Sequence, residues 1–237
     1  MIRATMLIIG HRGAAGLAPE NTLEALRAGV EADADILEFD IRLTKDLIPV
    51  LIHDATTMRT HHKRLTVAKH TYAELTEFVG PLTTLEDVLD EFFGQILLNI
   101  ELKSKGSGQV VATLLKNKYI YKNSDWDAVL LSSFKGKELS AVRSVSQRAN
   151  LAVLHDQNPF IFIAYQRRLH LTAVGFHRLY VNQFALEIAK KTGLFAYAYT
   201  VDRPRTAEIL QQKGIDAVVT NRPDVVSERF NRLRIES

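Results

Sequence analysis

The stretch Asp35-Ile-Leu-Glu-Phe-Asp-Ile41 is a short apolar run that carries two acidic residues, Glu38 and Asp40. A second run, Ile96-Leu-Leu-Asn-Ile-Glu-Leu102, carries Glu101 close to its end. Apolar runs of this length are typical of buried strands, where a carboxylate without a partner is costly. Three such carboxylates that converge on one place indicate a bound cation, which would offset that cost.

Outward from these two runs, short apolar segments alternate with longer amphipathic segments. The predicted strands are Met6 to Gly10, Asp35 to Arg42, Ile96 to Leu102, Ala128 to Ser132, Asn150 to Leu154, Ala173 to Phe176, Leu194 to Val201 and Asp216 to Thr220. The predicted helices are Thr22 to Ala32, Thr84 to Phe93, Ser107 to Asn117, Gly136 to Ser146, Pro159 to Leu169, Phe184 to Thr192, Pro204 to Lys213 and Pro223 to Leu233. This strict alternation predicts parallel strands joined by helical crossovers.

One apolar run, Pro49-Val-Leu-Ile-His53, breaks the alternation because only a few residues separate it from the second strand. A parallel return needs a dozen or more residues, so this run must come back antiparallel. The sequence therefore predicts an α/β fold, a closed (β/α)₈ TIM barrel with a small hairpin excursion after the second strand. An open doubly wound sheet is the alternative, but such sheets usually carry a glycine-rich phosphate loop, which we do not find.

The composition permits this fold and narrows the chemistry. A chain of 237 residues with 46% hydrophobic residues can bury one large core, and no repeat or linker divides it, so we expect one domain over residues 1–237. The absence of cysteine excludes thiolate metal sites and cysteine nucleophiles. Any metal must therefore be held by oxygen or imidazole ligands, which favours a hard cation.

Charge and hydropathy set limits on the partners. The net charge of +3 comes from basic and acidic residues that are nearly balanced along the chain, so nucleic acid is not implied. No segment approaches the roughly 18 apolar residues of a membrane span. Met1 to Gly10 is too short and too weakly patterned for a signal peptide. We therefore expect a cytoplasmic protein without stable membrane insertion.

Polar residues gather where the predicted strands end, which is where chemistry takes place in barrels of this kind. Glu38 and Asp40 lie two residues apart in the second strand, and Glu101 and Lys103 lie two apart around the end of the third. Residues at this spacing share one face of a strand. Any one of them alone could belong to an ion pair at the rim, but the ordered set favours a functional site.

Several motifs occur in an order that resembles the glycerophosphodiester phosphodiesterase family, a group of phospholipase-C-like TIM barrels. The stronger motifs are His11-Arg-Gly-Ala-Ala-Gly-Leu-Ala-Pro-Glu-Asn-Thr22, Glu38-Phe-Asp40, Pro49-Val-Leu-Ile-His-Asp54 and Glu101-Leu-Lys103. Weaker matches are Ser132-Ser-Phe134, Tyr199-Thr-Val-Asp202 and Thr220-Asn-Arg-Pro-Asp224. The resemblance implies a metal-dependent hydrolase of lipid and glycerol metabolism that converts glycerophosphodiesters to an alcohol and sn-glycerol 3-phosphate.

The same resemblance implies a role for each site residue. It implies metal ligands at Glu38, Asp40 and Glu101, catalytic histidines at His11 and His53, phosphate-binding residues at Arg12 and Lys103, and substrate-pocket residues at Phe134 and Tyr199. The implied cofactor is a divalent cation. Mg²⁺ and Ca²⁺ both accept carboxylate oxygens, and Mn²⁺ is a third candidate.

These roles also agree with elementary chemistry. A phosphodiester concentrates negative charge as it is attacked, so a cation together with Arg12 and Lys103 stabilises the transition state more than the ground state. A histidine with a pKa of about 6.5 can accept or deliver a proton at neutral pH. One of His11 and His53 is therefore expected to act as base and the other as acid. The sequence leaves open which is which, and whether water or the neighbouring glycerol hydroxyl attacks.

The chain departs from the family pattern at several positions. Where the family usually shows Trp-Thr-Val-Asn, this chain has Tyr199-Thr-Val-Asp202, so we expect a phenol and an extra negative charge in the pocket wall. The hairpin, commonly closed by glycine in the family, carries Leu47, where a turn with positive φ would be strained. The region with His61 and His62 is expected to be a solvated loop or lid.

Two other functions remain open at this point. A phosphodiesterase of the lysophospholipase D type would need an apolar trough for an acyl chain, for example around Phe134 and Phe160. A catalytically silent protein that binds phosphodiesters is a different class, but a pure binder has no need for His11 and His53. In each case the partner is a small molecule.

Overall fold

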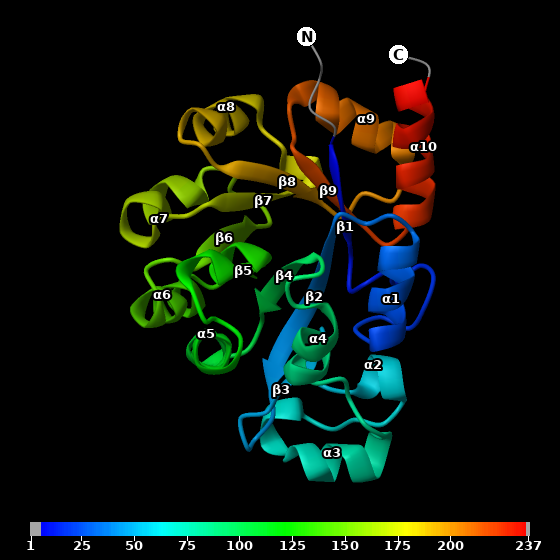
Figure 1. The fold of residues 1–237 in the computed structure, drawn as a ribbon, viewed down its shortest axis with the longest axis vertical. Helices are drawn as coiled ribbons and strands as arrows, with labels where there is room; N and C mark the ends of the chain where they lie inside the picture. Colours follow the sequence, from blue (N-terminus) through cyan, green and yellow to red (C-terminus); the bar gives the residue numbers. More distant parts are fainter. Residues whose placement is uncertain (1–5, 236–237) are drawn as a thin grey trace.

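Parallel strands form a closed barrel at the centre of the structure, a computed structural model that describes residues 6–235, with side chains through residue 230. The strands are β1 (Leu7–Gly10), β2 (Ile36–Leu43), β3 (Pro49–Leu51), β4 (Leu97–Leu102), β5 (Val129–Ser133), β6 (Asn150–His155), β7 (Ala173–His177), β8 (Phe195–Tyr199) and β9 (Ala217–Thr220). β1 pairs in parallel with both β2 and β9, which closes the ring (Figure 1). The predicted TIM barrel is confirmed, and the open-sheet alternative is wrong.

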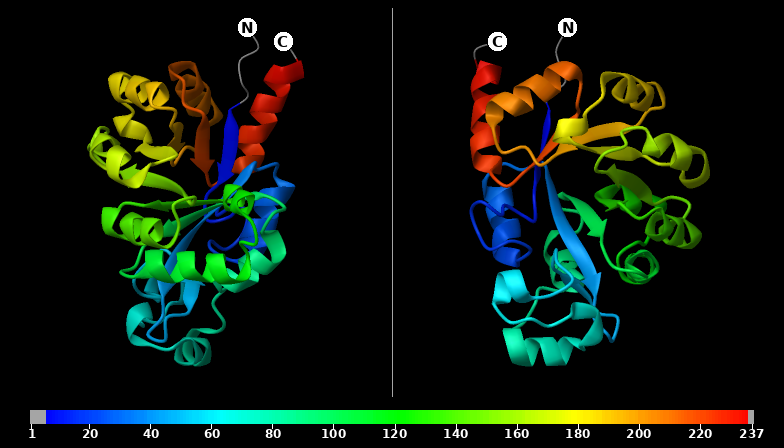
Figure 2. Two further views of the ribbon diagram at one scale, coloured as in Figure 1. Left: turned by 60° about the vertical axis from the view of Figure 1, so that its left-hand side comes forward. Right: turned by 180° about the vertical axis from the view of Figure 1, so that it is seen from behind.

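Helices surround the barrel on its outside (Figures 1 and 2). The helices that follow barrel strands or lead into them are α1 (Leu23–Glu31), α4 (Leu85–Phe92), α5 (Ser107–Lys118), α6 (Gly136–Val145), α7 (Ile161–Leu169), α8 (Gln183–Lys191), α9 (Pro204–Lys213) and α10 (Pro223–Ile235). Short 3₁₀ turns lie at Asn123–Ala128 and Arg178–Tyr180. Each of these longer helices was predicted, with ends that differ by about two residues or fewer.

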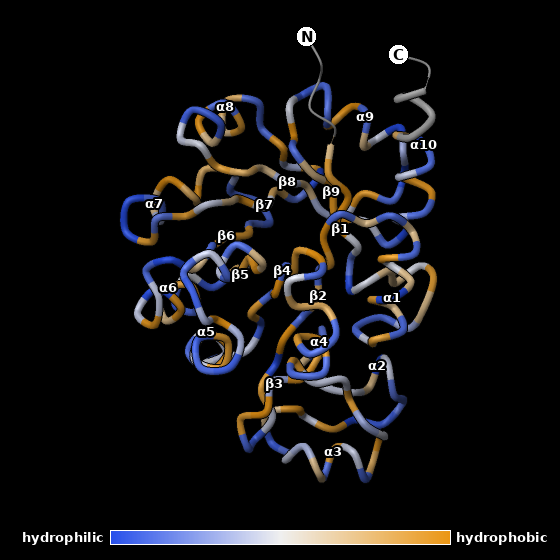
Figure 3. The backbone as a smooth tube through the Cα atoms, in the orientation of Figure 1, coloured by the Kyte–Doolittle hydropathy of each residue, from blue (hydrophilic) through white to orange (hydrophobic). Residues whose placement is uncertain are grey.

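The alternation of side chains along β2 decides what faces the barrel interior. Leu37, Phe39 and Ile41 belong to the large core cluster that also contains residues of the outer helices. The intervening residues point the other way, because successive side chains in a strand alternate between its two faces. Glu38 and Asp40 therefore face the barrel interior, and both are buried. Figure 3 shows how apolar residues concentrate along the central strands.

The excursion after β2 forms a small lobe of its own, at the bottom of Figure 1. β3 pairs with β2 in the predicted antiparallel sense, with Ile41 opposite Leu51. A separate cluster of buried residues fills the lobe, namely Val50, Ile52, Val67, Leu75 and Leu82. The lobe thus carries a core in addition to the one that stabilises the barrel.

The sequence did not predict the helices of this lobe. The polar segment around His61 and His62, expected to be a solvated loop or lid, contains the end of α2 (Met58–His61) and a 3₁₀ turn (Val67–Lys69), and α3 (Tyr72–Val79) follows it. Thr71 and Glu74 form a capping box at the start of α3, with reciprocal side-chain and backbone hydrogen bonds. No helix was predicted over α3, although Thr71 followed three residues later by Glu74 is a start signal for a helix.

The helices of residues 6–235 include none that is both long and apolar enough to cross a membrane. The single-domain prediction over residues 1–237 stays a prediction, and its two ends, residues 1–5 and 236–237, lie outside the described residues.

Candidate active site

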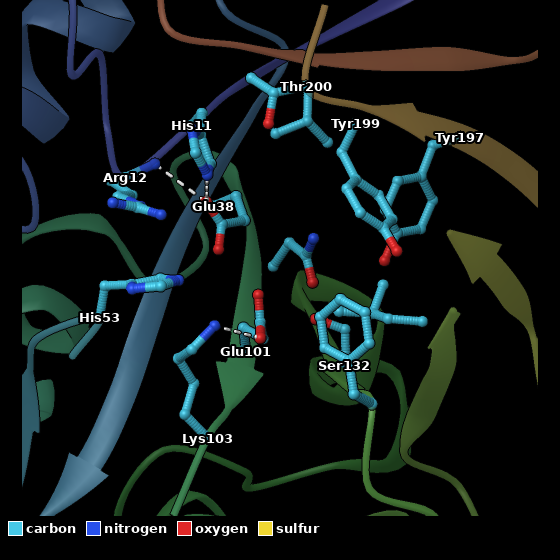
Figure 4. A pocket seen from close by; sticks show the side chains of 14 residues that line it. His11, Arg12, Glu38, His53, Glu101, Lys103, Ser132, Tyr197, Tyr199 and Thr200 are labelled. Atoms are coloured by element: carbon cyan, nitrogen blue, oxygen red, sulfur yellow. Dashed lines mark hydrogen bonds and ion pairs between the residues drawn. The ribbon is translucent and has the colours of Figure 1, made fainter. Parts of the chain in front are cut away.

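A pocket opens at the carboxyl ends of the barrel strands (Figure 4). Its lining includes all but one of the predicted site residues: His11, Arg12, Glu38, His53, Glu101, Lys103, Phe134 and Tyr199. The remaining one, Asp40, is buried next to the pocket and forms ion pairs with Arg12 and Lys103. The structure thus brings together residues that are far apart in the sequence.

Three carboxylates lie together at one side of this pocket. Glu38, Asp40 and Glu101 each offer an oxygen, and these atoms lie within 4.8 Å of one another. Burial and then repulsion from Asp40 raise the pKa of Glu38 to about 8 and that of Glu101 to about 7. Burial would also raise the pKa of Asp40, but Lys103 and Arg12 hold it below its usual value. Full ionisation of the group therefore requires additional positive charge.

Two cationic side chains already meet these carboxylates. Nε of Arg12 lies 3.2 Å from Oδ2 of Asp40, and Nζ of Lys103 lies 2.6 Å from Oε1 of Glu101. Nζ of Lys103 also lies 3.2 Å from Oδ1 of Asp40. Two positive charges thus face three carboxyl groups, so one more positive charge is needed to balance the cluster when all three are ionised.

A hard divalent cation fits this donor set. Oε1 of Glu38 is buried and has no hydrogen-bond partner among the described residues, so an acceptor is left over inside the pocket. Its other oxygen, Oε2, accepts a hydrogen bond of 2.9 Å from the backbone nitrogen of Arg12. Clustered carboxylate oxygens are the ligands that Mg²⁺, Ca²⁺ and Mn²⁺ prefer.

A chain of polar contacts orients His11. Nδ1 of His11 lies 2.7 Å from Oδ1 of Asn221, whose Nδ2 donates a 3.0 Å hydrogen bond to Asp202. A carboxylate only accepts hydrogen bonds, so Asp202 fixes the amide orientation and leaves the Asn221 oxygen facing His11. Nδ1 of His11 must then carry the proton. Its Nε2 lies 4.0 Å from Oε2 of Glu38, and burial followed by the charge of Arg12 lowers the pKa of His11.

This contact corrects one expectation about the pocket. Asp202 was expected to add negative charge to the pocket wall, but it is not among the described residues that line the pocket. Its carboxylate accepts hydrogen bonds from the backbone nitrogen and the side chain of Asn221. Asp202 therefore contributes indirectly, because it orients Asn221, the residue that contacts His11.

His53 has a carboxylate as its partner. Nδ1 of His53 lies 2.7 Å from Oδ1 of Asp54, and the backbone oxygen of His53 accepts a 2.8 Å hydrogen bond from Nε of Arg42. Burial lowers the pKa of His53, while the charge of Asp40 and the hydrogen bond to Asp54 act in the opposite direction. The excursion places His53 here, because Ile52 donates a backbone hydrogen bond to Asp40 just before it.

The opposite wall is aromatic. The rings of Phe134 and Tyr199 meet edge to face with centroids 6.0 Å apart, and Tyr199 meets His177 in the same manner at 5.9 Å. The ring of His177 in turn lies 5.4 Å from that of Tyr180. Figure 4 shows Tyr199 on the far side of the pocket from His11 and His53. The pocket therefore has a charged half and an aromatic half.

The sequence also matches a known family of proteins. Residues 11–225 match the model of the glycerophosphoryl diester phosphodiesterase family. The chain belongs to this family. Membership confirms the predicted enzyme class, a phosphoric diester hydrolase.

Related proteins and structures agree with the family match. The chain is 30% identical to a glycerophosphodiester phosphodiesterase of Caldanaerobacter subterraneus, over 93% of this chain and 96% of the relative. It is 27% identical to a glycerophosphodiester phosphodiesterase of Bacillus subtilis, over 93% of this chain and 85% of the relative. A phosphodiesterase from Oleispira antarctica, solved in complex with the product sn-glycerol 3-phosphate, has the same fold, with a TM-score of 0.83 at 24% identity, covering 95% of this chain and 96% of that one.

Sequence reasoning missed the supporting residues of this family member. Asn221 and Asp54 both lie inside motifs that the sequence singled out, yet the motifs alone did not show which side chain each one contacts. Asn99 and Tyr197 were also missed: both are buried in the lining of the pocket, together with Ser132, which the sequence had placed at a strand end. A polar residue inside an apolar strand, such as Asn99, was the available signal.

Proposed function

We propose that this protein hydrolyses glycerophosphodiesters to an alcohol and sn-glycerol 3-phosphate, with a divalent cation as cofactor. One observation carries the proposal: three clustered carboxylates, two cationic side chains and two histidines line or adjoin a single pocket. Family membership and the product bound to the Oleispira antarctica protein support the same reaction. The cytoplasmic location inferred from the sequence remains part of this proposal.

Glu38, Asp40 and Glu101 would hold the cation. When bound, the cation supplies positive charge to the phosphate oxygens and to the charge that develops on them during attack. Arg12 and Lys103 act in the same direction, because both are held at the edge of the carboxylate cluster and line the pocket. A phosphodiester between them is bound by one planar guanidinium and one ammonium group.

The environments of the two histidines suggest a division of roles. His11 receives no charge-assisted support at Nδ1, because its partner is the neutral amide of Asn221, and its lowered pKa favours the neutral ring. Its Nε2 is then free to accept a proton, so we assign it as the general base. Burial lowers the pKa of His53 as well, but its partner is the carboxylate of Asp54, which opposes that shift and supports a protonated ring, so we assign it as the acid that protonates the leaving alcohol.

A second substrate class is supported by the surface beside the pocket. Large apolar side chains are exposed beside the aromatic half: Phe134 lines the pocket, and Leu179 and Tyr180 lie within three residues of His177, whose ring meets that of Tyr199. Leu179 is 72% exposed, whereas a leucine side chain is usually buried. This surface would suit the acyl chain of a lysophospholipid, so the same chemistry on monoacyl substrates is the second candidate.

The test is hydrolysis by metal-stripped protein with Mg²⁺, Ca²⁺ or Mn²⁺ added back. Glycerophosphocholine and lysophosphatidylcholine would be compared, with released choline measured for both and sn-glycerol 3-phosphate for the first. We expect release only with a cation, and a loss of about 100-fold or more in His11→Asn and in His53→Asn. His170→Asn is the matched control, because His170 is exposed, lies outside the lining of the pocket and is replaced by a residue that tolerates its positive φ.

Each outcome has a distinct meaning. Faster release from the monoacyl substrate would make the lysophospholipid the physiological class. Stoichiometric binding of either compound without release under any metal would favour the catalytically silent binder instead. Full activity in both histidine variants would refute the assignment of His11 as base and His53 as acid.

A further inference from the structure

Arg59, in the short helix α2, joins two carboxylates that each contact a residue of the candidate site. Nε of Arg59 donates to Oδ2 of Asp54 at 2.7 Å. Its Nη1 and Nη2 donate to the two oxygens of Glu20, each at 2.7 Å. All three nitrogens of one guanidinium group are therefore engaged with negatively charged partners.

Each of these carboxylates continues to a pocket residue through a further contact. Oδ1 of Asp54 lies 2.7 Å from Nδ1 of His53. Oε1 of Glu20 accepts a 2.9 Å hydrogen bond from Nη1 of Arg12. One branch therefore leads from Arg59 to His53, and the other leads from Arg59 to Arg12. Arg59 itself is not among the described residues that line the pocket.

The position of Arg59 in the fold gives this contact a geometric role. Glu20 lies in the loop between β1 and α1, whereas Asp54 and Arg59 belong to the excursion that follows β3. Glu20 and Arg59 are 39 residues apart in sequence. The guanidinium thus ties the excursion, which carries His53, to the loop that carries Arg12. A planar fork can hold two carboxylates in fixed directions, which a lysine ammonium cannot do.

Stability alone is a weak explanation for this arrangement. The side chain of Arg59 is 47% exposed and that of Asp54 is 34% exposed. Ion pairs with this exposure contribute little to folding, because water and salt screen them. A second bidentate pair of the same kind, Arg27 with Glu91, joins α1 to α4, and within residues 6–230 neither side chain forms a hydrogen bond or ion pair with a pocket residue. The two pairs differ in the further contacts of their carboxylates, because only the partners of Arg59 also contact pocket residues, namely Arg12 and His53.

We propose that Arg59 is a positioning residue that orients His53 through Asp54 and Arg12 through Glu20. The proposal rests on the proposed function, in which His53 transfers a proton and Arg12 binds phosphate. Loss of Arg59 frees both carboxylates, so the imidazole and the guanidinium each gain orientations that do not suit the substrate.

The first experiment compares Arg59→Ala, Arg59→Lys and Arg27→Ala. We expect Arg59→Ala to lower kcat/KM by about 10- to 100-fold, as is typical when a supporting partner of a site is removed. Both constants should change, kcat through His53 and KM through Arg12. Arg59→Lys should restore only part of the activity, since an ammonium cannot bond both carboxylates in the same geometry. Arg27→Ala should match the wild type in activity. Its effect on thermal stability should be similar to that of Arg59→Ala.

A mutant cycle separates positioning from a general structural effect. In the Glu20→Ala/Asp54→Ala background both acceptors are gone and the two branches are already broken, so adding Arg59→Ala should change kcat/KM less than two-fold. Independent effects would instead multiply. Wild-type kinetics in Arg59→Ala, or its full loss retained in the double-variant background, would overturn the proposal.

A readout that needs no turnover keeps this test apart from that of the proposed function. Nitrogen NMR of the histidine side chains reports which ring nitrogen of His53 carries the proton. In the wild type we expect a proton on Nδ1, held by Asp54, and in Arg59→Ala a shift of the His53 signals that Arg27→Ala does not produce. Unchanged His53 signals would refute the positioning role, whether or not glycerophosphodiesters prove to be the substrate.

Discussion

Leu47 is a residue whose side chain conflicts with its backbone. Its φ of 65° lies in the left-handed region, as the sequence predicted for the turn of this hairpin. The side chain is 58% exposed, so little packing compensates for the strain. Left-handed backbone costs an L-residue about 1–2 kcal/mol, and the extra flexibility of unfolded glycine offsets about half of that. We expect Leu47→Gly to stabilise the protein by about 0.5–1 kcal/mol, seen as a higher urea midpoint with an unchanged slope.

The control for this prediction is Leu47→Ala. Alanine keeps a Cβ atom and therefore keeps the strain, so its urea midpoint should stay close to that of the wild type. Equal stabilisation by alanine and glycine would show that removal of the exposed leucine side chain, and not the backbone conformation, is the cause.

Individual site residues differ in how far the sequence could predict them. Glu38 and Asp40 stand out because a carboxylate inside an apolar strand is costly, so its presence needs a reason. Asn221 and Glu20 lie in polar loops, where any residue of their type is ordinary. Their importance comes from contacts across the fold, such as that of Asn221 with His11, which is 210 residues away in sequence. Such partners depend on three-dimensional placement that a single sequence does not state.

At the scale of elements, the barrel and the antiparallel return of β3 were predictable, and the helices of the excursion were not. Barrel strands are recognisable because they are buried on both faces and read as continuous apolar runs, as in Ala217–Thr220. α2 has only four residues and no buried residue, so it lacks a hydrophobic pattern. α3 buries only Leu75 among its residues. α3 is stabilised by its capping box and by Leu75, which belongs to the small core of the lobe, and both are weak signals in sequence.

The cap of α3 offers a test of this view. Thr71 Oγ1 accepts a hydrogen bond from the backbone nitrogen of Glu74, and Oε2 of Glu74 accepts one of 2.7 Å from the nitrogen of Thr71. Thr71→Ala should cost about 1 kcal/mol, because one cap is lost from a helix with little packing. Hydrogen exchange should speed up across Tyr72–Val79, while α4 stays protected. Thr71→Ser keeps the hydroxyl and should leave exchange nearly unchanged; equal acceleration in both variants would contradict a role for the cap.

At the scale of the whole molecule, the alternation of side chains along the strands couples core packing to the position of the site residues. The same alternation that buries Leu37, Phe39 and Ile41 under the helices turns Glu38 and Asp40 into the barrel. Burial of Glu38 and Glu101 in the barrel therefore costs free energy of folding, which the apolar core must offset. The raised pKa values of about 8 and 7 reflect this cost. Between the ordinary pKa of these groups and the raised values, the folded protein binds more protons than the unfolded chain. Without a cation, the contribution of these two groups to the free energy of unfolding therefore falls as the pH rises toward the raised pKa values of about 7 and 8.

A bound divalent cation should reverse this trend. It favours the ionised carboxylates, so its stabilising effect should be larger at pH 8 than at pH 6, where protons compete for Glu38 and Glu101. At pH 8 and about 100 times the dissociation constant, linkage gives about 2.7 kcal/mol, or roughly 5–10 °C in Tm for a chain of this size. The measurement is Tm with and without Mg²⁺, Ca²⁺ or Mn²⁺ at both pH values. Glu101→Gln should lose most of the shift while exposed Glu31→Gln keeps it, and an equal shift in both variants would place the cation outside the three carboxylates.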